Sequence, residues 1–276
     1  MKLSFTTLAC PSWDLDTIVK QAVIAGFDGV DFRGLQQQMH VYELPAFTSS
    51  LERTIRTFQE AQLELSCFSS SVHLFPHEKQ EQNVREIQAY AELCQRFQTK
   101  YIRVFGGDIE GTERSRAIEV TAQHLKVLAD IASGYGVKLL LETHDDWTDC
   151  RDVRSILEAA NHEAVAVLWD VHHPYRTIGE NPEHTWDKLG RWIAYTHWKD
   201  SYLDESQKFG HRYCLMGEGD LPLQSIYNLC QEQKYDGWYT LEWEKRWHPD
   251  IEEPEIALPQ YVAYMKKLAK SNLHEE

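Results

Sequence analysis

Four side chains that can bind a metal ion stand at the ends of apolar segments in the second half of the sequence. Glu142 follows the run Lys-Leu-Leu-Leu, Asp170 follows Val-Ala-Val-Leu-Trp, and His197 and Glu242 close two further strand-like runs. Three carboxylates and one imidazole suit a divalent cation such as Mn, Co, Mg or Zn, with positions left open for substrate oxygens. A shared cation would also offset the mutual repulsion of the carboxylates. The pattern predicts one metal site, provided that the fold brings the four segments together.

The elements that must position these residues alternate between strand and helix along the sequence. Amphipathic segments of helical period, such as 16–25, 81–97, 116–135 and 221–234, separate short β-branched and aromatic runs. Several of these runs are apolar at nearly every position, which is typical of parallel strands covered on both faces. Eight runs predict strands: 3–9, 29–33, 63–69, 101–105, 138–144, 165–170, 192–199 and 237–242.

Eight strand-helix repeats, without a Gly-rich phosphate-binding motif after the first strand, favour a closed α/β barrel, the (β/α)8 TIM barrel, over a doubly wound dinucleotide-binding sheet. The chain of 276 residues fits the roughly 250-residue range of that barrel, so we expect a single domain over residues 1–276. The C-terminal ends of the strands then converge on one rim, and alternation along each strand turns all four candidate ligands inward. The longest irregular stretch, 201–220, is expected on the same rim as a lid or binding loop.

Three further residues lie at or near predicted strand ends. Arg33 closes the second strand and His73 lies just past the third, so both are candidates for substrate binding at the rim, with solvated surface positions as the alternative. His144 is a candidate for contact with the substrate or with a metal ligand, and a structural histidine bonded to the backbone is the alternative.

Lys199 shares the inward face of His197, because the two residues are two apart in one predicted strand. Its ammonium group is a candidate for contact with a substrate anion or hydroxyl. The alternative is a salt bridge to Asp200 or Glu218.

Five short motifs surround the candidate ligands and the predicted loop after the seventh strand: Leu141-Glu142-Thr143-His144, Trp169-Asp170-Val171-His172-His173, Thr196-His197-Trp198-Lys199-Asp200, Gly217-Glu218-Gly219-Asp220 and Leu241-Glu242-Trp243-Glu244. As a set, these motifs make the sequence resemble the xylose isomerase-like TIM barrels, and among them the sugar phosphate isomerase/epimerase group. That group includes ketose 3-epimerases, inosose isomerases and dehydratases, and 3-dehydroshikimate dehydratases. The resemblance extends from Ala25-Gly26-Phe27-Asp28-Gly29-Val30 to the last strand.

The resemblance implies one divalent metal held by the four residues at the strand ends. It also implies that the first and last of them, Glu142 and Glu242, move the proton on the carbon next to a carbonyl. His173 falls in the second place of the family's Asp-x-x-His motif and would hydrogen-bond a substrate oxygen. Lys199 stands where the epimerases usually carry an arginine. With the two glutamates, His173 and Lys199 complete the implied catalytic set.

We expect an isomerase or epimerase of a keto sugar, cyclitol or related polyol, acting by proton transfer through a metal-stabilised enediolate. A dehydratase for inosose or 3-dehydroshikimate is the alternative, because proton abstraction is common to both reactions. The chain also departs from the epimerases, which place another glutamate shortly after the strand-five ligand, where Asp145, Asp146 and Thr148 stand here. An endonuclease IV-like nuclease and a barrel that binds without turnover are less favoured. The nuclease lacks support because strand four ends Phe105-Gly106-Gly107, without the additional histidine of that family.

The composition of the chain argues against two classes of partner, nucleic acids and membranes. A formal charge of -15 opposes binding to nucleic-acid phosphates, and no apolar run approaches the roughly 20 residues of a membrane helix. The six cysteines form no CxxC pair and the N-terminus shows no signal-peptide pattern, so we expect a cytoplasmic protein with reduced thiols. A small polyol or keto-sugar substrate is the expected partner, and formation of a homo-oligomer is left open.

Overall fold

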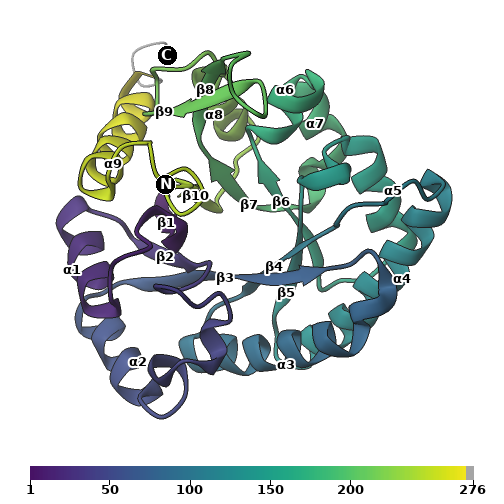
Figure 1. Ribbon diagram of the computed structural model, residues 1–276, viewed down its shortest axis with the longest axis horizontal. Helices are drawn as coiled ribbons and strands as arrows, with labels where there is room; N and C mark the ends of the chain where they lie inside the picture. The colour runs from purple at the N-terminus through teal and green to yellow at the C-terminus, as the bar shows by residue number, and fades with distance from the viewer. Residues whose placement is uncertain (272–276) are drawn as a thin grey trace.

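The computed structural model, which describes residues 1–271, is a closed barrel of eight parallel strands surrounded by helices (Figure 1). Successive barrel strands pair with each other, and the last pairs with the first, in the order β1-β10-β7-β6-β5-β4-β3-β2. This confirms the predicted (β/α)8 fold. The strands are β1 (Lys2–Thr6), β2 (Gly29–Phe32), β3 (Glu64–His73), β4 (Tyr101–Phe105), β5 (Lys138–Glu142), β6 (Val165–Asp170), β7 (Ile193–Trp198) and β10 (Trp238–Leu241).

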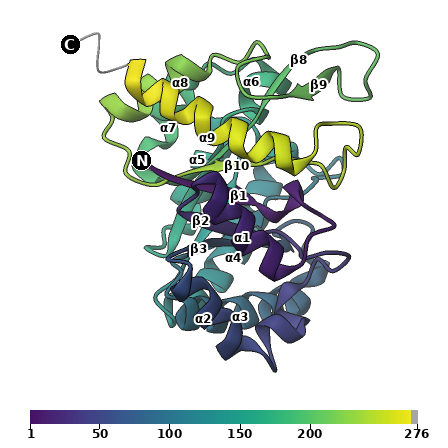
Figure 2. The same cartoon turned by 90° about the vertical axis from the view of Figure 1, so that its left-hand side faces the viewer.

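The helices form a ring outside the strands (Figure 1). Local signals set their ends: Asp14 accepts the N–H of Thr17 at the start of α1, and Gly26, with φ of 87°, ends it. Helix α9 packs beside α1, which closes the ring (Figure 2). The bounds are α1 (Leu15–Ala25), α2 (Leu51–Glu60), α3 (Gln80–Phe97), α4 (Arg114–Ser133), α5 (Cys150–Ala160), α6 (His173–Ile178), α7 (Pro182–Leu189), α8 (Leu223–Glu232) and α9 (Pro254–Ser271). Within residues 1–271, none of these helices combines the length and apolarity needed to cross a membrane.

Two expectations about the segments are corrected. The first predicted strand, 3–9, ends at Thr6 and continues as a 3-10 turn over Thr7–Ala9, whereas the third extends as far as His73. The stretch 201–220 is not irregular, because it contains most of an antiparallel hairpin of β8 (Asp200–Leu203) and β9 (His211–Cys214). Cross-strand hydrogen bonding organises this hairpin, which projects at the opposite end of the barrel from the N-terminus (Figure 2).

Side-chain alternation divides the apolar core into two clusters. The smaller cluster fills the barrel interior and the larger one packs between the strands and the helices. The interior cluster contains Leu140, Leu168 and Tyr195, each two residues before a candidate ligand on the same strand. The inward direction predicted for Glu142, Asp170 and His197 is therefore what the packing shows.

Candidate metal centre and active site

The barrel brings the four residues at the strand ends into one buried cluster. Glu142, Asp170, His197 and Glu242 each offer a ligand atom, and these atoms all lie within 4.8 Å of one another. The strand register accounts for part of this arrangement, because Asp170 on β6 pairs directly with His197 on β7. Ligands on opposite sides of a divalent ion, each about 2.2 Å from it, are about 4.4 Å apart. The cluster therefore has nearly the dimensions of one coordination sphere.

The imidazole of His197 connects two of the glutamates to a residue that the sequence did not indicate. Its Nδ1 lies 3.2 Å from Oε1 of Glu142 and 3.3 Å from Oε1 of Glu242, while Nε2 lies 3.2 Å from Oδ2 of Asp31. Burial opposes the charged form, but the three carboxylates outweigh it and raise the pKa of His197 well above its ordinary value. A cation among these carboxylates would supply the positive charge that the protonated imidazole supplies without it. Nδ1 could then bind it while Nε2–H donates to Asp31.

Asp170 has one oxygen held by the backbone and one left for another group. Its Oδ1 accepts the N–H groups of His172 and His173 at 2.8 and 3.0 Å. Within the described chain, its buried Oδ2 receives no hydrogen bond of good geometry and lies 2.9 Å from Nζ of Lys199. Burial and the neighbouring glutamates raise the pKa of Asp170 to about 6, against the opposing effect of Lys199. A buried, incompletely bonded carboxylate oxygen that faces a cation fits a metal ligand.

Arg103 fixes the position of Glu142. It lies inside the barrel on β4, with Nε 3.2 Å from Oε2 of Glu142 and NH1 donating to the carbonyl of Ser70 at 3.0 Å. The guanidinium also lies 3.6 Å from the ring centroid of Phe105. Burial alone would raise the pKa of Glu142, but Arg103 and the bonded His197 hold it below the ordinary value. Glu142 is thus kept as a carboxylate although it is fully buried.

Lys199 lies beside the cluster and does not form the salt bridge to Asp200 or Glu218 that was the alternative to substrate contact. Its ammonium group contacts Oδ2 of Asp170, Oε2 of Glu242 and Oε1 of Glu244, the first and last at 2.9 Å. These anions outweigh the effect of burial and raise the pKa of Lys199 well above its ordinary value. Lys199 does not reach Asp200 because its side chain points inward on the same face as His197. The carboxylate of Asp200 instead accepts the backbone N–H groups of Gly217 and Gly219.

The other predicted site residues surround the cluster through a chain of ring contacts. Phe105, the last residue of β4, stacks on His73 at 4.9 Å between centroids and contacts His144 at 4.8 Å. His144 in turn contacts His173 at 4.6 Å, and Nε2 of His173 lies 3.1 Å from Nζ of Lys199. Burial and the nearby Lys199 lower the pKa of His173 well below its ordinary value, so the imidazole is neutral.

Arg33 reaches the same wall from β2. Its guanidinium donates to the hydroxyl of Ser71 at 3.0 Å and lies 5.8 Å from the centroid of Phe105. Burial and the like charge of Arg103 lower its pKa to about 10. The structure therefore brings Arg33, His73, His144, His173 and Lys199 to the mouth of the barrel, around the acidic cluster.

Sequence reasoning missed three residues of this site. Asp31 and Arg103 are charged, yet each stands inside an apolar strand and is at most 1% exposed. A charged residue in the middle of a buried strand is the signal that would have indicated both, because burial of an unpaired charge is costly. Phe105 carries no such signal, since an aromatic residue at a strand end is ordinary.

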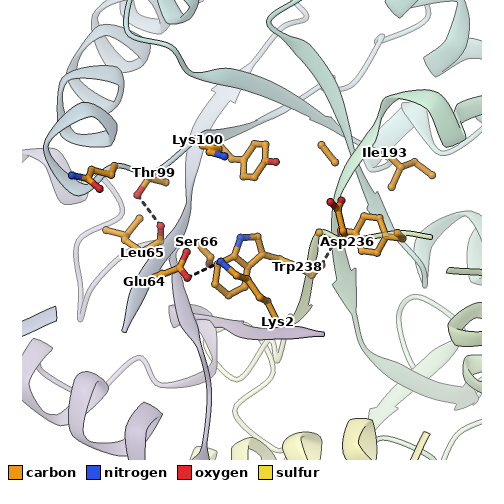
Figure 3. Close-up of a pocket in the computed structure, with 14 residues that line it drawn as sticks. Lys2, Glu64, Leu65, Ser66, Thr99, Lys100, Ile193, Asp236 and Trp238 are labelled. Atoms are coloured by element: carbon orange, nitrogen blue, oxygen red, sulfur yellow. Dashed lines mark hydrogen bonds and ion pairs between the residues drawn. The ribbon is translucent and has the colours of Figure 1, made fainter. Parts of the chain in front are cut away.

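A separate cavity opens at the other end of the barrel, where the strands begin (Figure 3). It measures about 350 Å³ and is bordered by Lys2, Glu64, Lys100, Asp236 and Trp238, among others. Lys2 pairs with Glu64 at 2.6 Å, and both side chains are at least half exposed. The N-terminal face of a TIM barrel serves stability, and the chemistry gathers at the opposite face. We therefore place the candidate active site at the acidic cluster.

A closed parallel barrel with three carboxylates and an imidazole at its C-terminal rim defines a TIM barrel with a metal-competent centre. Residues 19–268 match the family described as xylose isomerase-like TIM barrel, so the chain belongs to that family. It is an enzyme of this family, as its relatives are. A 3-dehydroshikimate dehydratase of Bacillus anthracis is 25% identical, over 82% of this chain and 84% of that protein. An inosose dehydratase of Clostridium beijerinckii is 23% identical, over 91% of this chain and 87% of that protein.

Solved structures agree on the fold. The structure of the IOLI protein with a binding zinc atom superposes with a TM-score of 0.80 and 18% identity, covering 98% of this chain and 99% of that one. A xylose isomerase-like TIM barrel protein of Mycobacterium smegmatis in complex with magnesium gives a TM-score of 0.71 and 15% identity, covering 98% and 97%. Zinc and magnesium thus occur in proteins of this fold, and this chain has an acidic and imidazole cluster that could hold a metal ion.

Proposed function

We propose that this protein is a metal-dependent lyase that removes water from a polyhydroxylated ring ketone. This replaces the isomerase or epimerase expectation with its alternative. The relatives named 3-dehydroshikimate dehydratase and inosose dehydratase support it, because both names describe water loss from such a ketone. The observation that carries the proposal is the ammonium group of Lys199, which contacts both Glu242 and His173 beside the acidic cluster. Dehydration needs a second group that donates a proton to the leaving hydroxyl, whereas isomerisation can return to carbon the proton that the base has taken.

Glu142, Asp170, His197 and Glu242 would hold the metal, which supplies polarisation of the ketone and so acidifies the neighbouring C–H. Among the glutamates, Glu242 suits the base, since it is 6% exposed and Glu142 is fully buried against Arg103. Glu242 takes the proton from carbon, and the electron pair of the C–H bond forms the C=C bond. The C–O bond of the β-hydroxyl breaks and Lys199 supplies the proton that completes water.

The contact between Glu242 and Lys199 then resets the site. The carboxylic acid formed on Glu242 returns its proton to the amine of Lys199 directly, so the protein ends each turnover in its starting protonation state. His173 accepts from the Lys199 ammonium at 3.1 Å and holds it toward the barrel mouth. Because one paired group takes the proton and the other gives it, both act from the same side of the substrate.

Arg33 favours a substrate with an anionic group. Its partly buried guanidinium lies on the same wall as His73 and Phe105, where a carboxylate of a ring ketone would gain a charge-assisted hydrogen bond. 3-Dehydroshikimate carries a carboxylate and inosose does not, so we expect faster turnover of the former.

The test is NMR of the metal-loaded protein with 3-dehydroshikimate and with inosose in deuterated water. We expect loss of water to an unsaturated product, and Lys199→Met should still exchange the C–H proton for deuterium while losing elimination by roughly 100-fold or more. Lys245→Met, which removes a buried lysine paired with Glu253, is the matched control and should keep elimination. Formation of an epimer or isomer without water loss would contradict the proposal and support an isomerase or epimerase instead.

A further inference from the structure

A second group of metal-competent side chains lies outside the barrel, where α5 and α7 begin. Cys150 is the first residue of α5, and Glu180 and His184 lie just before and within the first turn of α7. One ligand atom from each of the three residues lies within 4.8 Å of the others. The two segments follow β5 and β6, which carry Glu142 and Asp170, so this group connects two loops of the active-site face.

The donor atoms differ in kind from those of the acidic cluster. Cys150 offers a sulfur, Glu180 a carboxylate oxygen and His184 an imidazole nitrogen. Sulfur and imidazole donors select zinc and similar late divalent ions, whereas magnesium and calcium prefer oxygen. A thiolate and a carboxylate would together neutralise the two charges of such an ion. Cys150 is fully buried and His184 is exposed, which leaves the outer side open to a water as the fourth ligand.

The carboxylate of Glu180 is already oriented by partners on both of its oxygens. Its Oε1 accepts the hydroxyl of Thr185 at 2.5 Å, and its Oε2 accepts the backbone N–H of Cys150 at 3.1 Å. Outer partners of this kind hold metal-ligating carboxylates in place, and each oxygen keeps a lone pair for a cation. The sulfur of Cys150 lies within 4.8 Å of a ligand atom of Glu180 and of one of His184. The thiol therefore borders the carboxylate and the imidazole as well as the apolar core in which Cys150 is packed.

We propose that Cys150, Glu180 and His184 form a second, structural site for zinc or a similar late divalent ion, which joins the loop after β5 to the loop after β6. The ion would replace the thiol proton and stiffen two loops next to the active site. The site is independent of the proposed reaction. In its absence Glu180 simply caps the start of α5, and that simpler role is the competing explanation.

Cobalt titration of the metal-free full-length protein tests the proposal, because a cysteine ligand gives a near-ultraviolet sulfur-to-cobalt charge-transfer band. The acidic cluster contains no cysteine, so the band reports on the second site alone. We expect the band to appear, to disappear on addition of zinc, and to persist in Asp170→Asn, which changes only the acidic cluster. An X-ray anomalous map of zinc-soaked crystals would locate the ion directly.

Variants test whether the sulfur of Cys150 gives rise to the charge-transfer band. Cys150→Ser should abolish the band, and Cys214→Ser, the matched change at a buried cysteine of the hairpin, should leave it intact. His184→Ala removes an exposed ligand with little risk to folding. It should weaken cobalt binding by at least the roughly 10- to 100-fold that loss of an outer-shell partner costs. Absence of the band in the folded wild-type protein, or a band unchanged in both Cys150→Ser and His184→Ala, would overturn the proposal.

Discussion

His197 and Asp31 meet inside the barrel, with Nε2 3.2 Å from Oδ2, although 166 residues separate them in the sequence. Both side chains are fully buried. The contact fixes the rotation of the imidazole and leaves Nδ1 directed at Glu142 and Glu242. Asp31 thus orients a candidate metal ligand of β7 from β2, a strand that is not its neighbour in the barrel.

Asp31→Asn should weaken metal binding by about 10- to 100-fold, because the neutral amide no longer supports the basicity of His197. Isothermal titration of the metal-free protein with zinc measures the effect. Asp28→Asn is the control, since Asp28 accepts the backbone N–H of Leu3 and lies away from the site. Equal affinities for wild type and Asp31→Asn would show that Asp31 does not support the ligand.

Arg103→Met should destabilise the metal-free protein by about 3–5 kcal/mol, because Glu142 would be left as an unpaired buried carboxylate. The loss should be smaller when metal is bound, since a cation then compensates Glu142. Chemical unfolding with and without metal measures both values. Arg151→Met, at an exposed arginine paired with Asp149, should change the free energy of unfolding far less. A loss that metal leaves unchanged would argue against Glu142 as a ligand.

Lys199→Met should tighten metal binding, because the ammonium and a metal compete for the charge of Asp170 and Glu242. A unit charge a few ångströms away contributes on the order of kcal/mol even at an effective dielectric of 20, so we expect about tenfold or more. Competition with a chelator of known affinity provides the measurement. Weaker binding in Lys199→Met would place the lysine among the groups that support the ion.

The pair of His144 and Asp145 should make the stability of the metal-free protein depend on pH. Burial opposes protonation of His144, but the hydrogen bond from Nδ1 to Asp145 and the nearby Glu142 outweigh it and raise its pKa to about 8 from 6.5. Because the folded pKa is the higher one, the stabilisation is complete below about pH 6.5 and is lost as the pH rises through about 8. NMR titration of the His144 ring and unfolding across that range test this. His144→Gln should remove this contribution to the pH dependence, and a pKa of His144 at or below 6.5 in the wild-type protein would contradict the prediction.

Gly106→Ala should destabilise the protein by roughly 1–3 kcal/mol. An added Cβ would lie 2.0 Å from Cδ1 of Trp147, whose ring is fully buried. Either the indole or the chain after β4 must move, and that chain begins next to Phe105. Thermal unfolding is the measurement. Gly134→Ala, where the nearest contact is a carbonyl at 3.3 Å and φ is −61°, should be nearly neutral.

The repeating pattern of apolar runs and amphipathic segments was sufficient to predict the barrel, because each period is a local property of the chain. The predicted ends of the strands were less accurate. Thr7, Leu8 and Ala9 have the composition of a strand, yet they turn into a 3-10 helix where the first strand leaves the barrel. The hairpin of β8 and β9 was also missed, since its pairing depends on contacts between its two strands.

For the candidate site, residue type and position at strand ends were enough to indicate Glu142, Asp170, His197 and Glu242, because parallel strands deliver their ends to one rim. Only the tertiary structure decided what surrounds them. Asp31 and Arg103 come from strands in the first half of the chain. Their charges are tolerated only because His197 faces Asp31 inside the barrel and Glu142 stands on the strand next to Arg103. Such pairing is a property of distances between strands, which the order of residues along one strand does not contain.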